Sequence, residues 1–273
     1  MPSRTAKMMR MPRVITSNGY AIGYEEAGGS STATPIAFLH GVGSDKNVWH
    51  PQLAHFSRSR RAIAFDYPGY GDSDRAPRGT TRDDYADAII SAMHDLGVDR
   101  AHICGLSLGG VVAIAMHHAD RSCCASLVLA DSFAAHPNGL AIYERSLEGS
   151  RDLRTMAEAR VDVLLAQPAD SEVRREVVET MSSIEPDAYR IGAEAVWLAD
   201  QRERAQDISV PALILVGDQD FVTPIDLSNE LVDLIPDARM QVITGAGHLT
   251  NLEKPDEFNC IVEAFIAEVE GMA

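Results

Sequence analysis

The chain has 273 residues, and its 45% hydrophobic and 23% charged content is typical of a globular protein, so disorder is not expected. Its 40 acidic and 24 basic side chains give a formal net charge of -16, which argues against a nucleic-acid partner because neutralising phosphates requires clustered lysine and arginine. No segment approaches the ~20 apolar residues needed to cross a bilayer, so no membrane association is expected.

The chain opens with its one basic stretch, Arg4 to Arg13, which lacks the apolar core of a secretory signal. Residues 1–12 are therefore predicted to form a flexible tail. Between residues 13 and 28, two β-like runs flank Asn18-Gly19, a dipeptide that favours tight turns with positive φ. This segment predicts an opening hairpin.

The next elements predict a parallel sheet. Residues 35–39 and 61–65 are continuous apolar runs, typical of strands that are buried on both faces. Thr81 can cap a helix whose apolar positions recur with the helical period, and Gly97 can end it. This alternation of strand and helix predicts right-handed crossovers between parallel strands.

A serine stands between glycines in Gly105-Leu106-Ser107-Leu108-Gly109, after the apolar run 101–104 and before the helical pattern 110–117. On a sharp strand-to-helix turn the glycines avoid Cβ collisions, and the hydroxyl is forced out into a cleft. We interpret this segment as a nucleophile elbow, with Ser107 as the nucleophile. The alternative is that Ser107 is only a small residue in a tight turn.

An attacked carbonyl also needs two hydrogen-bond donors for its oxyanion. Leu108 N–H, directly after the serine, is one candidate. Val42 N–H is the other, from the loop after the first buried strand, with Gly43 as the fallback. Gly41 and Gly43 are expected to line the substrate pocket. His40 is expected either to line it as well or to act as a hydrogen-bonded strut.

The pattern changes after a further core strand at residues 125–130. Residues 133–207 are charged, helical in period and without a strand candidate, so they predict a helical cap inserted between two strands of the sheet. Trp197 lies in this cap and is a candidate for the substrate pocket. Cap arginines such as Arg154 and Arg190 could pair with a substrate carboxylate, or form ion pairs at the surface.

A serine hydroxyl needs a base, and the base needs an acid that orients it. The buried run 211–217 ends in Asp218-Gln219-Asp220, at the carboxyl edge of the predicted sheet. Asp220 is the predicted acid. Asp218 and Asp131 are alternatives, because Asp218 lies two residues away and Asp131 ends the strand after the nucleophile helix.

His248 is the predicted base. It follows the β-like run 240–243 and the small residues of Gly245-Ala246-Gly247, which allow a tight turn. Pro255 then opens a final amphipathic helix. The order serine, acid, histidine along the chain is the order of the α/β-hydrolase fold and differs from those of chymotrypsin and subtilisin.

The chain therefore resembles an α/β-hydrolase over nearly its whole length. Within that superfamily it is similar to the 3-oxoadipate enol-lactonase group, through GLSLGG at 105–110, LVLAD at 127–131 and HLTNLE at 248–253. It departs from that group at His40, where those enzymes commonly carry a polar, non-histidine residue. The resemblance implies a mostly parallel sheet flanked by helices, with a core of residues 13–132 and 208–273 and a cap of residues 133–207.

The resemblance also implies a cofactor-free hydrolase that cleaves a small carboxylic ester or lactone through an acyl-serine. Among enzymes, the alternatives are a general carboxylesterase, an acyl-homoserine lactonase and a carbon–carbon bond hydrolase acting on ring-cleavage products. A serine nucleophile argues against haloalkane dehalogenases and epoxide hydrolases, which use aspartate. A non-enzymatic alternative is a small-molecule receptor that retains the triad. Of macromolecular partners, only a second copy of the chain is left open.

Four cysteines, Cys104, Cys123, Cys124 and Cys260, lie in or beside predicted core elements, and the adjacent pair does not suit a disulfide framework. They are predicted to be reduced, buried thiols in a cytoplasmic protein. No residues show the ligand spacing of a zinc site, so no metal is expected.

Overall fold

The computed structural model describes residues 12–16, 19–29 and 32–271, so nearly all of the predicted tail lies outside the described residues. Within them the chain forms an eight-stranded sheet in the order β1-β2-β4-β3-β5-β6-β7-β8. The strands are β1 (Arg13–Ile15), β2 (Ala21–Ala27), β3 (Ile36–Leu39), β4 (Ala62–Phe65), β5 (Ala101–Leu106), β6 (Cys124–Ala130), β7 (Ala212–Gly217) and β8 (Ala238–Ile243). The predicted hairpin is confirmed, because β1 pairs antiparallel with β2; β2 pairs antiparallel with β4, and the strands from β4 to β8 in this order pair in parallel.

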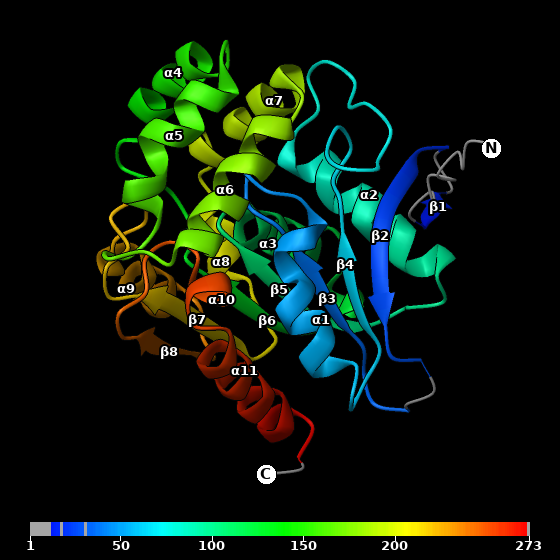
Figure 1. Cartoon of the computed structure of the whole chain (residues 1–273). Helices are drawn as coiled ribbons and strands as arrows, with labels where there is room; N and C mark the ends of the chain where they lie inside the picture. The colour runs from blue at the N-terminus through cyan, green and yellow to red at the C-terminus, as the bar shows by residue number, and fades with distance from the viewer. Residues whose placement is uncertain (1–11, 17–18, 30–31, 272–273) are drawn as a thin grey trace, which may run out of the picture.

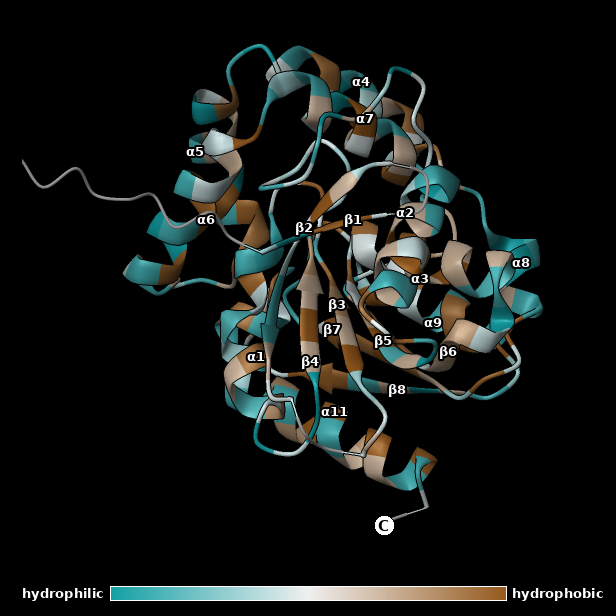
Figure 2. Ribbon diagram, turned by 90° about the vertical axis from the view of Figure 1, so that its right-hand side faces the viewer, coloured by the Kyte–Doolittle hydropathy of each residue, from teal (hydrophilic) through white to brown (hydrophobic). Residues whose placement is uncertain are grey.

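Helices cover both faces of this sheet (Figures 1 and 2). On one face α1 (His50–Phe56) contacts α11 (Pro255–Val269), and on the other α2 (Arg82–Asp95) packs against α3 (Leu108–Ala119). The shorter elements of the core are the 3-10 helices η1 (Lys46–Trp49) and η2 (Arg121–Cys123) and the helices α9 (Ile225–Leu234) and α10 (Thr250–Glu253). The expected mostly parallel α/β sheet flanked by helices is confirmed.

The apolar runs of the sequence form the buried centre of the sheet. Every residue of β3, β4, β5, β6 and β7 is buried, as expected for parallel strands covered by helices on both faces. The edge strand β8 alternates between exposed and partly buried residues over most of its length. Thr81 is the N-cap residue of helix α2, as predicted, and forms a capping box with Asp84. Gly97 follows the helix at φ +71°.

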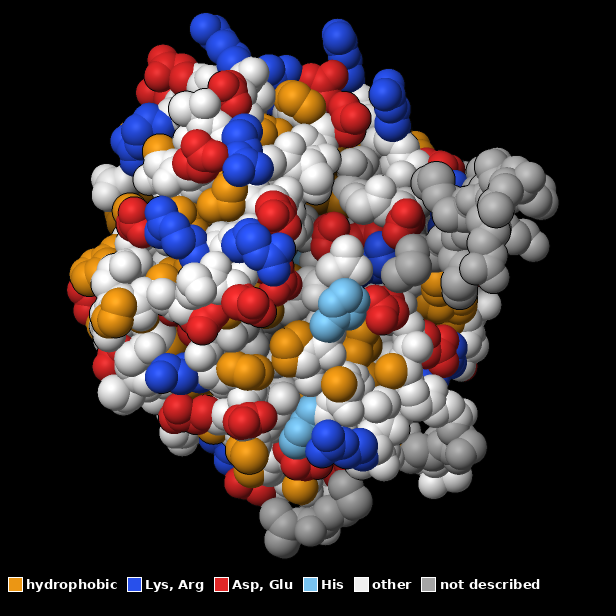
Figure 3. Space-filling view, viewed as in Figure 1, with side chains coloured by type: hydrophobic (Ala, Val, Ile, Leu, Met, Phe, Trp, Pro, Cys, Tyr) orange, Lys and Arg blue, Asp and Glu red, His pale blue; other side chains and the backbone are white. Residues whose placement is uncertain are grey.

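Five helices lie between β6 and β7 in the sequence: α4 (Gly139–Gly149), α5 (Leu153–Leu164), α6 (Ser171–Ser183), α7 (Pro186–Trp197) and α8 (Arg202–Gln206). Figure 1 shows α4 to α7 above the edge of the sheet toward which the parallel strands run. The segment also contains one isolated antiparallel bridge, between Ala135 and Asp200. The surface in Figure 3 carries acidic and basic side chains interspersed over these helices, with no broad basic patch on that face.

A buried ion cluster fastens the loop after β3 to the loop after β4. The Lys46 ammonium donates to Asp66 at 2.7 Å and to Asp72 at 2.6 Å, and its backbone N–H donates to Asp66 at 2.9 Å. The side chains of Lys46 and Asp66 are 1% and 0% exposed. Burial alone would lower the pKa of Lys46, but Asp66 and Asp72 raise it above its ordinary value. Gly71 is required here, since a Cβ at its φ of +47° would lie 2.3 Å from an Asp66 oxygen.

Replacing Lys46 with methionine is expected to destabilise the protein by about 3–5 kcal/mol, because Asp66 would remain buried without its counter-ion. Denaturant unfolding measures this change. The matched surface variant, Arg121→Met, breaks an exposed pair with Asp207 and should cost less than about 1 kcal/mol. The double variant Lys46→Met, Asp66→Asn should recover part of the lost free energy of unfolding. If the losses of the two single variants simply add in the double variant, Lys46 and Asp66 are not energetically coupled.

The cysteine prediction is correct for three residues and wrong for the fourth. Cys104, Cys123 and Cys124 are buried free thiols, and burial raises the pKa of Cys104 well above its ordinary value. Cys260 is exposed, because it lies on α11 outside the stripe of buried apolar residues that includes Phe258 and Val262. No helix among the described residues is both long and apolar enough to span a membrane.

Candidate active site

Ser107 lies on the turn between β5 and α3, with φ 54° and ψ -112°, a conformation that costs a non-glycine residue about 1–3 kcal/mol. Its neighbours permit this turn. A Cβ at Gly105 would lie 2.2 Å from the backbone of Gly109, and a Cβ at Gly109 would lie 2.1 Å from the carbonyl oxygen of Leu39. The glycines therefore let α3 begin directly against β5 and β3, which holds Ser107 in its strained conformation.

The predicted acid and base are hydrogen-bonded to each other. His248 Nδ1 lies 2.8 Å from Asp220 Oδ2. The other carboxylate oxygen of Asp220 accepts hydrogen bonds from the backbone N–H groups of Val222 at 2.8 Å and Thr223 at 2.9 Å. Because a carboxylate only accepts, the neutral form of His248 carries its proton on Nδ1, and its Nε2 is left with the lone pair that a base needs.

Asp220 is held as a carboxylate. Burial alone would raise its pKa, but the charge of His248 and hydrogen bonds from His248 and Thr223 lower it to about 2. The Thr223 hydroxyl donates at 2.6 Å to Asp220 Oδ2, the oxygen that is bonded to His248, and lies 3.3 Å from His248 Nδ1. Thr223 was not predicted from the sequence, although a hydroxyl residue three positions after an aspartate is a recognisable turn signal.

The two alternative aspartates have other partners. Asp131, fully buried at the end of β6, accepts from Gly217 N–H at 3.1 Å and from the Thr250 hydroxyl at 2.5 Å. Burial and the nearby Asp220 raise the pKa of Asp131 well above its ordinary value. Asp218 is exposed and accepts from Gly245 N–H at 2.7 Å. Both carboxyls fasten the loops that carry the acid and the base.

The histidine loop is also fastened to the helices above the sheet. His248 N–H donates to the carbonyl of Leu164, the last residue of α5, at 2.8 Å. Glu253 accepts from Gly247 N–H at 2.9 Å and Leu249 N–H at 3.3 Å with one oxygen, and from Ala166 N–H at 2.7 Å with the other. The position of the imidazole therefore depends on the segment that follows α5.

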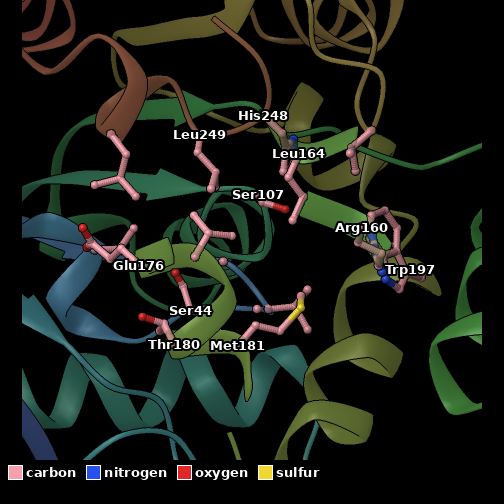
Figure 4. A pocket seen from close by; sticks show the side chains of 17 residues that line it. Ser44, Ser107, Arg160, Leu164, Glu176, Thr180, Met181, Trp197, His248 and Leu249 are labelled. Atoms are coloured by element: carbon pink, nitrogen blue, oxygen red, sulfur yellow. The ribbon is translucent and has the colours of Figure 1, made fainter. Parts of the chain in front are cut away.

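Ser107 and His248 line one cavity between the sheet edge and α5, α6 and α7, with about 620 Å³ of empty space that includes some open to solvent. Figure 4 shows their side chains near the centre of this cavity. The predicted pocket residues Gly41, Gly43 and Trp197 line it too, and so does Val42, which was predicted as an oxyanion donor. Further apolar residues of the lining are Val48, Leu164, Val177, Met181, Val222, Leu249 and Leu252. The cavity combines an apolar wall with a serine and a histidine, as a site for a small organic substrate requires.

The loop after β3 runs beside the serine. A Cβ at Gly41 would contact the Ser107 Cβ at 3.5 Å. Leu108 is the first residue of α3, so its N–H has no partner within that helix. In the part of the chain that the structure describes, the backbone hydrogen bonds of turns, loops and caps include none that Val42 N–H or Leu108 N–H donates. Both predicted oxyanion donors are thus free to bind a ligand oxygen.

The sequence leaves two alternatives open for His40, and the structure supports the hydrogen-bonded strut rather than the pocket lining. His40 is fully buried and absent from the cavity lining, and its Nδ1–H donates to the Gly41 carbonyl at 2.8 Å. Its ring packs against Tyr67 and Tyr70, with centroids 4.5 and 5.0 Å apart. Burial lowers the pKa of His40, although the charge of Asp66 opposes this. His40 is a strut under the loop, because the strand end points its side chain into the core.

The cap arginines considered from the sequence face elsewhere. Arg154 pairs with Glu158 at 2.6 Å, and Arg190 pairs with Asp187 at 2.8 Å. Instead, Arg160 and Glu176 line the cavity. No sequence signal distinguished these two from the other charged residues of α5 and α6, since the choice depends on how the helices are oriented over the sheet.

The described residues contain no group of three or more His, Cys, Asp or Glu side chains that could hold a metal ion. The polar groups in and beside the cavity include the Ser107 hydroxyl, the His248 imidazole bonded to Asp220, and the N–H groups of Val42 and Leu108.

Comparisons with known proteins agree with the α/β fold. Residues 36–259 match a family model described as the alpha/beta hydrolase family. The chain is 26% identical over 246 residues to 3-oxoadipate enol-lactonase 1 of Acinetobacter baylyi, covering 89% of this chain and 92% of that protein. The enol-lactonase of Burkholderia xenovorans superposes with a TM-score of 0.86 at 25% identity, covering 94% and 100% of the two chains. A thermophilic esterase of Thermogutta terrifontis gives 0.87 at 25% identity, covering 94% and 98%.

Proposed function

Because the chain belongs to the alpha/beta hydrolase family, we propose that it hydrolyses a carboxylic ester or lactone through an acyl intermediate on Ser107. The observation that carries this proposal is that Ser107 and His248 line the same cavity. This cavity contains a serine on a strained strand-to-helix turn and a histidine whose Nδ1 is bonded to the buried carboxylate of Asp220. These are the nucleophile, base and orienting acid of serine hydrolysis.

In the proposed reaction, Ser107 Oγ attacks the substrate carbonyl while His248 Nε2 takes its proton. The negative charge that forms on the carbonyl oxygen is stabilised by Leu108 N–H and Val42 N–H. Asp220 holds the imidazole and stabilises the imidazolium. The tetrahedral adduct collapses as His248 returns the proton to the departing alkoxide, and an acyl-serine remains. Water, deprotonated by His248, then releases the acid and restores Ser107.

With a lactone, the departing alcohol stays attached to the acyl group, so one ring-opened product results. The similarity to enol-lactonases supports a lactone as substrate, and the similarity to an esterase supports an open-chain ester. Helices α4 to α8 are proposed to act as the cap, over a core of residues 13–132 and 208–273. The site needs residues of one chain only, and the four free cysteines support a cytoplasmic setting.

Acid release in a pH-stat, from a panel of short esters, saturated lactones and enol-lactones, tests the proposal. Purified enzyme should release acid from at least one class of substrate. Prior treatment with a serine-directed phosphonate should abolish this release, and mass spectrometry should then detect one phosphonyl group on Ser107. Preference for lactones would identify a lactonase, and preference for open-chain esters an esterase. Phosphonate-insensitive release, or none from any substrate, would refute the proposal.

A further inference from the structure

One charged side chain of the cavity lacks a counter-ion. Arg160, on α5, lines the cavity together with Ser107 and is only partly buried. Its guanidinium donates to the Tyr189 hydroxyl at 3.3 Å. Among the residues that the structure describes, no carboxylate lies within the 4.0 Å of an ion pair with Arg160. Tyr189 is fully buried and occupies only one of the guanidinium nitrogens, so further N–H groups remain for a ligand.

Arg160 combines the lack of a counter-ion with a place in the cavity lining, whereas Arg145 and Arg151, which also have no ion pair within the described part of the chain, do not line the cavity. The other arginines from residue 154 to residue 204 each have a carboxylate partner: Arg154 with Glu158, Arg174 with Asp162, Arg175 with Glu179, Arg190 with Asp187, Arg202 with Asp200 and Glu230, and Arg204 with Asp83. All of these pairs lie away from the cavity lining. Among the described residues 139–206, Arg160 is therefore the arginine that both lacks an ion pair and lines the cavity with the proposed nucleophile.

The cavity is also polarised. Apart from His248, the charged side chains that line it are Arg160 and Glu176. Figure 4 shows Arg160 on the same side of Ser107 as Trp197, and Glu176 on the opposite side. Because the rest of the wall is mostly apolar, a negatively charged group on the substrate is attracted toward Arg160 and repelled from Glu176. This polarity orients a charged substrate across Ser107.

Arg160 stands where the cavity meets a second groove. Arg160 and Val222 line both the cavity and a groove of about 1580 Å³, a volume that includes open solvent. The other lining residues of the groove come from α4 and the residues before it, from α5, from the segment after β7 and from the start of α9. Phe221, beside the acid, is 75% exposed at this groove. A carboxylate bound to Arg160 would therefore keep some contact with solvent, which reduces the cost of removing it from water.

We propose that Arg160 binds a carboxylate of the substrate remote from the scissile carbonyl, so that the enzyme selects esters or lactones that carry a free acid group. This inference rests on the proposed function. A guanidinium binds a carboxylate through two parallel N–H···O bonds, which fix the orientation of the substrate as well as adding affinity. Arg160 is thus the residue that determines specificity, and Tyr189 is the residue that positions it.

The test uses matched pairs of substrates. Monoethyl esters of the diacids from succinate to suberate are compared with the same esters whose free acid is a primary amide, and kcat/KM is measured in a pH-stat. The unmodified enzyme should prefer the best acid ester over its amide by roughly 10- to 100-fold, the range expected for a hydrogen bond between charged groups. Arg160→Met should remove this preference, because kcat/KM should fall for the acid ester and stay unchanged for the amide. Arg154→Met, on the same helix, should retain it.

The outcomes separate this inference from the proposed function. Serine-dependent hydrolysis without any preference for the acid ester, or an equal loss on both esters in Arg160→Met, would overturn the role of Arg160 and leave the hydrolase intact. If neither ester is hydrolysed, calorimetric titration of the diacids into the full-length protein decides the matter. Binding that Arg160→Met weakens by about tenfold or more would support the anion site, and undetectable or unchanged binding would refute it.

Discussion

Ser107→Ala is expected to lower kcat/KM for the best ester or lactone by about 10⁴- to 10⁶-fold, the largest effect of any single substitution considered for this chain. The reason is that alanine provides no nucleophile, while the oxyanion donors and the binding cavity remain. The fold should be retained, because alanine has the same difficulty as serine at φ 54° and the Ser107 backbone keeps its hydrogen bonds to Ala130 and Ser132. Steady-state kinetics and denaturant unfolding measure the two quantities.

Ser44→Ala provides the matched control for this loss. Ser44 lines the same cavity but lies on the loop after β3, and Figure 4 shows it farther from His248 than Ser107 is. This variant is expected to keep most of the activity. A Ser107→Ala protein with near-normal turnover, or a Ser44→Ala protein as inactive as Ser107→Ala, would contradict the assignment of Ser107 as nucleophile.

Asp220→Asn is expected to reduce kcat on the order of 10⁴-fold with little change in cavity shape. The amide would present an N–H group or a neutral oxygen to His248 Nδ1, so it would neither fix the required tautomer nor stabilise the imidazolium. The Thr223 hydroxyl would also lose the charged acceptor to which it now donates at 2.6 Å. Single-turnover kinetics, in which release of the leaving group is monitored, measure the effect on the acylation step.

Asp131→Asn and Asp218→Asn are the controls for Asp220→Asn. The raised pKa of Asp131 favours its neutral acid, which an asparagine of the same size imitates, and Asp218 accepts from one backbone N–H that an amide oxygen can also bind. Both variants should keep activity within about tenfold of the unmodified enzyme. If Asp131→Asn or Asp218→Asn lost as much activity as Asp220→Asn, the acid would have been assigned to the wrong carboxylate.

The elements that the sequence predicted correctly are those with local causes. The strands β3 to β7 are continuous apolar runs, and such runs leave a chain few choices besides a strand buried on both faces. The turn at Ser107 is specified by its own glycines, and α2 is specified by its own capping residues. The order of Ser107, Asp220 and His248 along the chain then led to the α/β-hydrolase fold, which the comparisons confirm.

The predictions that were left open or were wrong have the opposite cause. His40 follows a strand, and a sequence does not state whether a residue at a strand end faces a cavity or the tyrosines of the next loop. Cys260 lies on an amphipathic helix, one position outside the buried stripe. Two neighbouring aspartates, Asp218 and Asp220, share the same local pattern, and only the path of the histidine loop selects the one bonded to His248.

The sequence by itself therefore determined the fold, the serine on its turn and the candidate acid and base, because each depends on periodicity or on steric rules within a few residues. Only the tertiary structure decided which charges reach the substrate. Arg154, Arg160 and Arg190 are alike in sequence, but two of them meet carboxylates on the surface and one faces Ser107. The physical reason is that the orientation of α5 over the sheet depends on long-range packing, which no local pattern records.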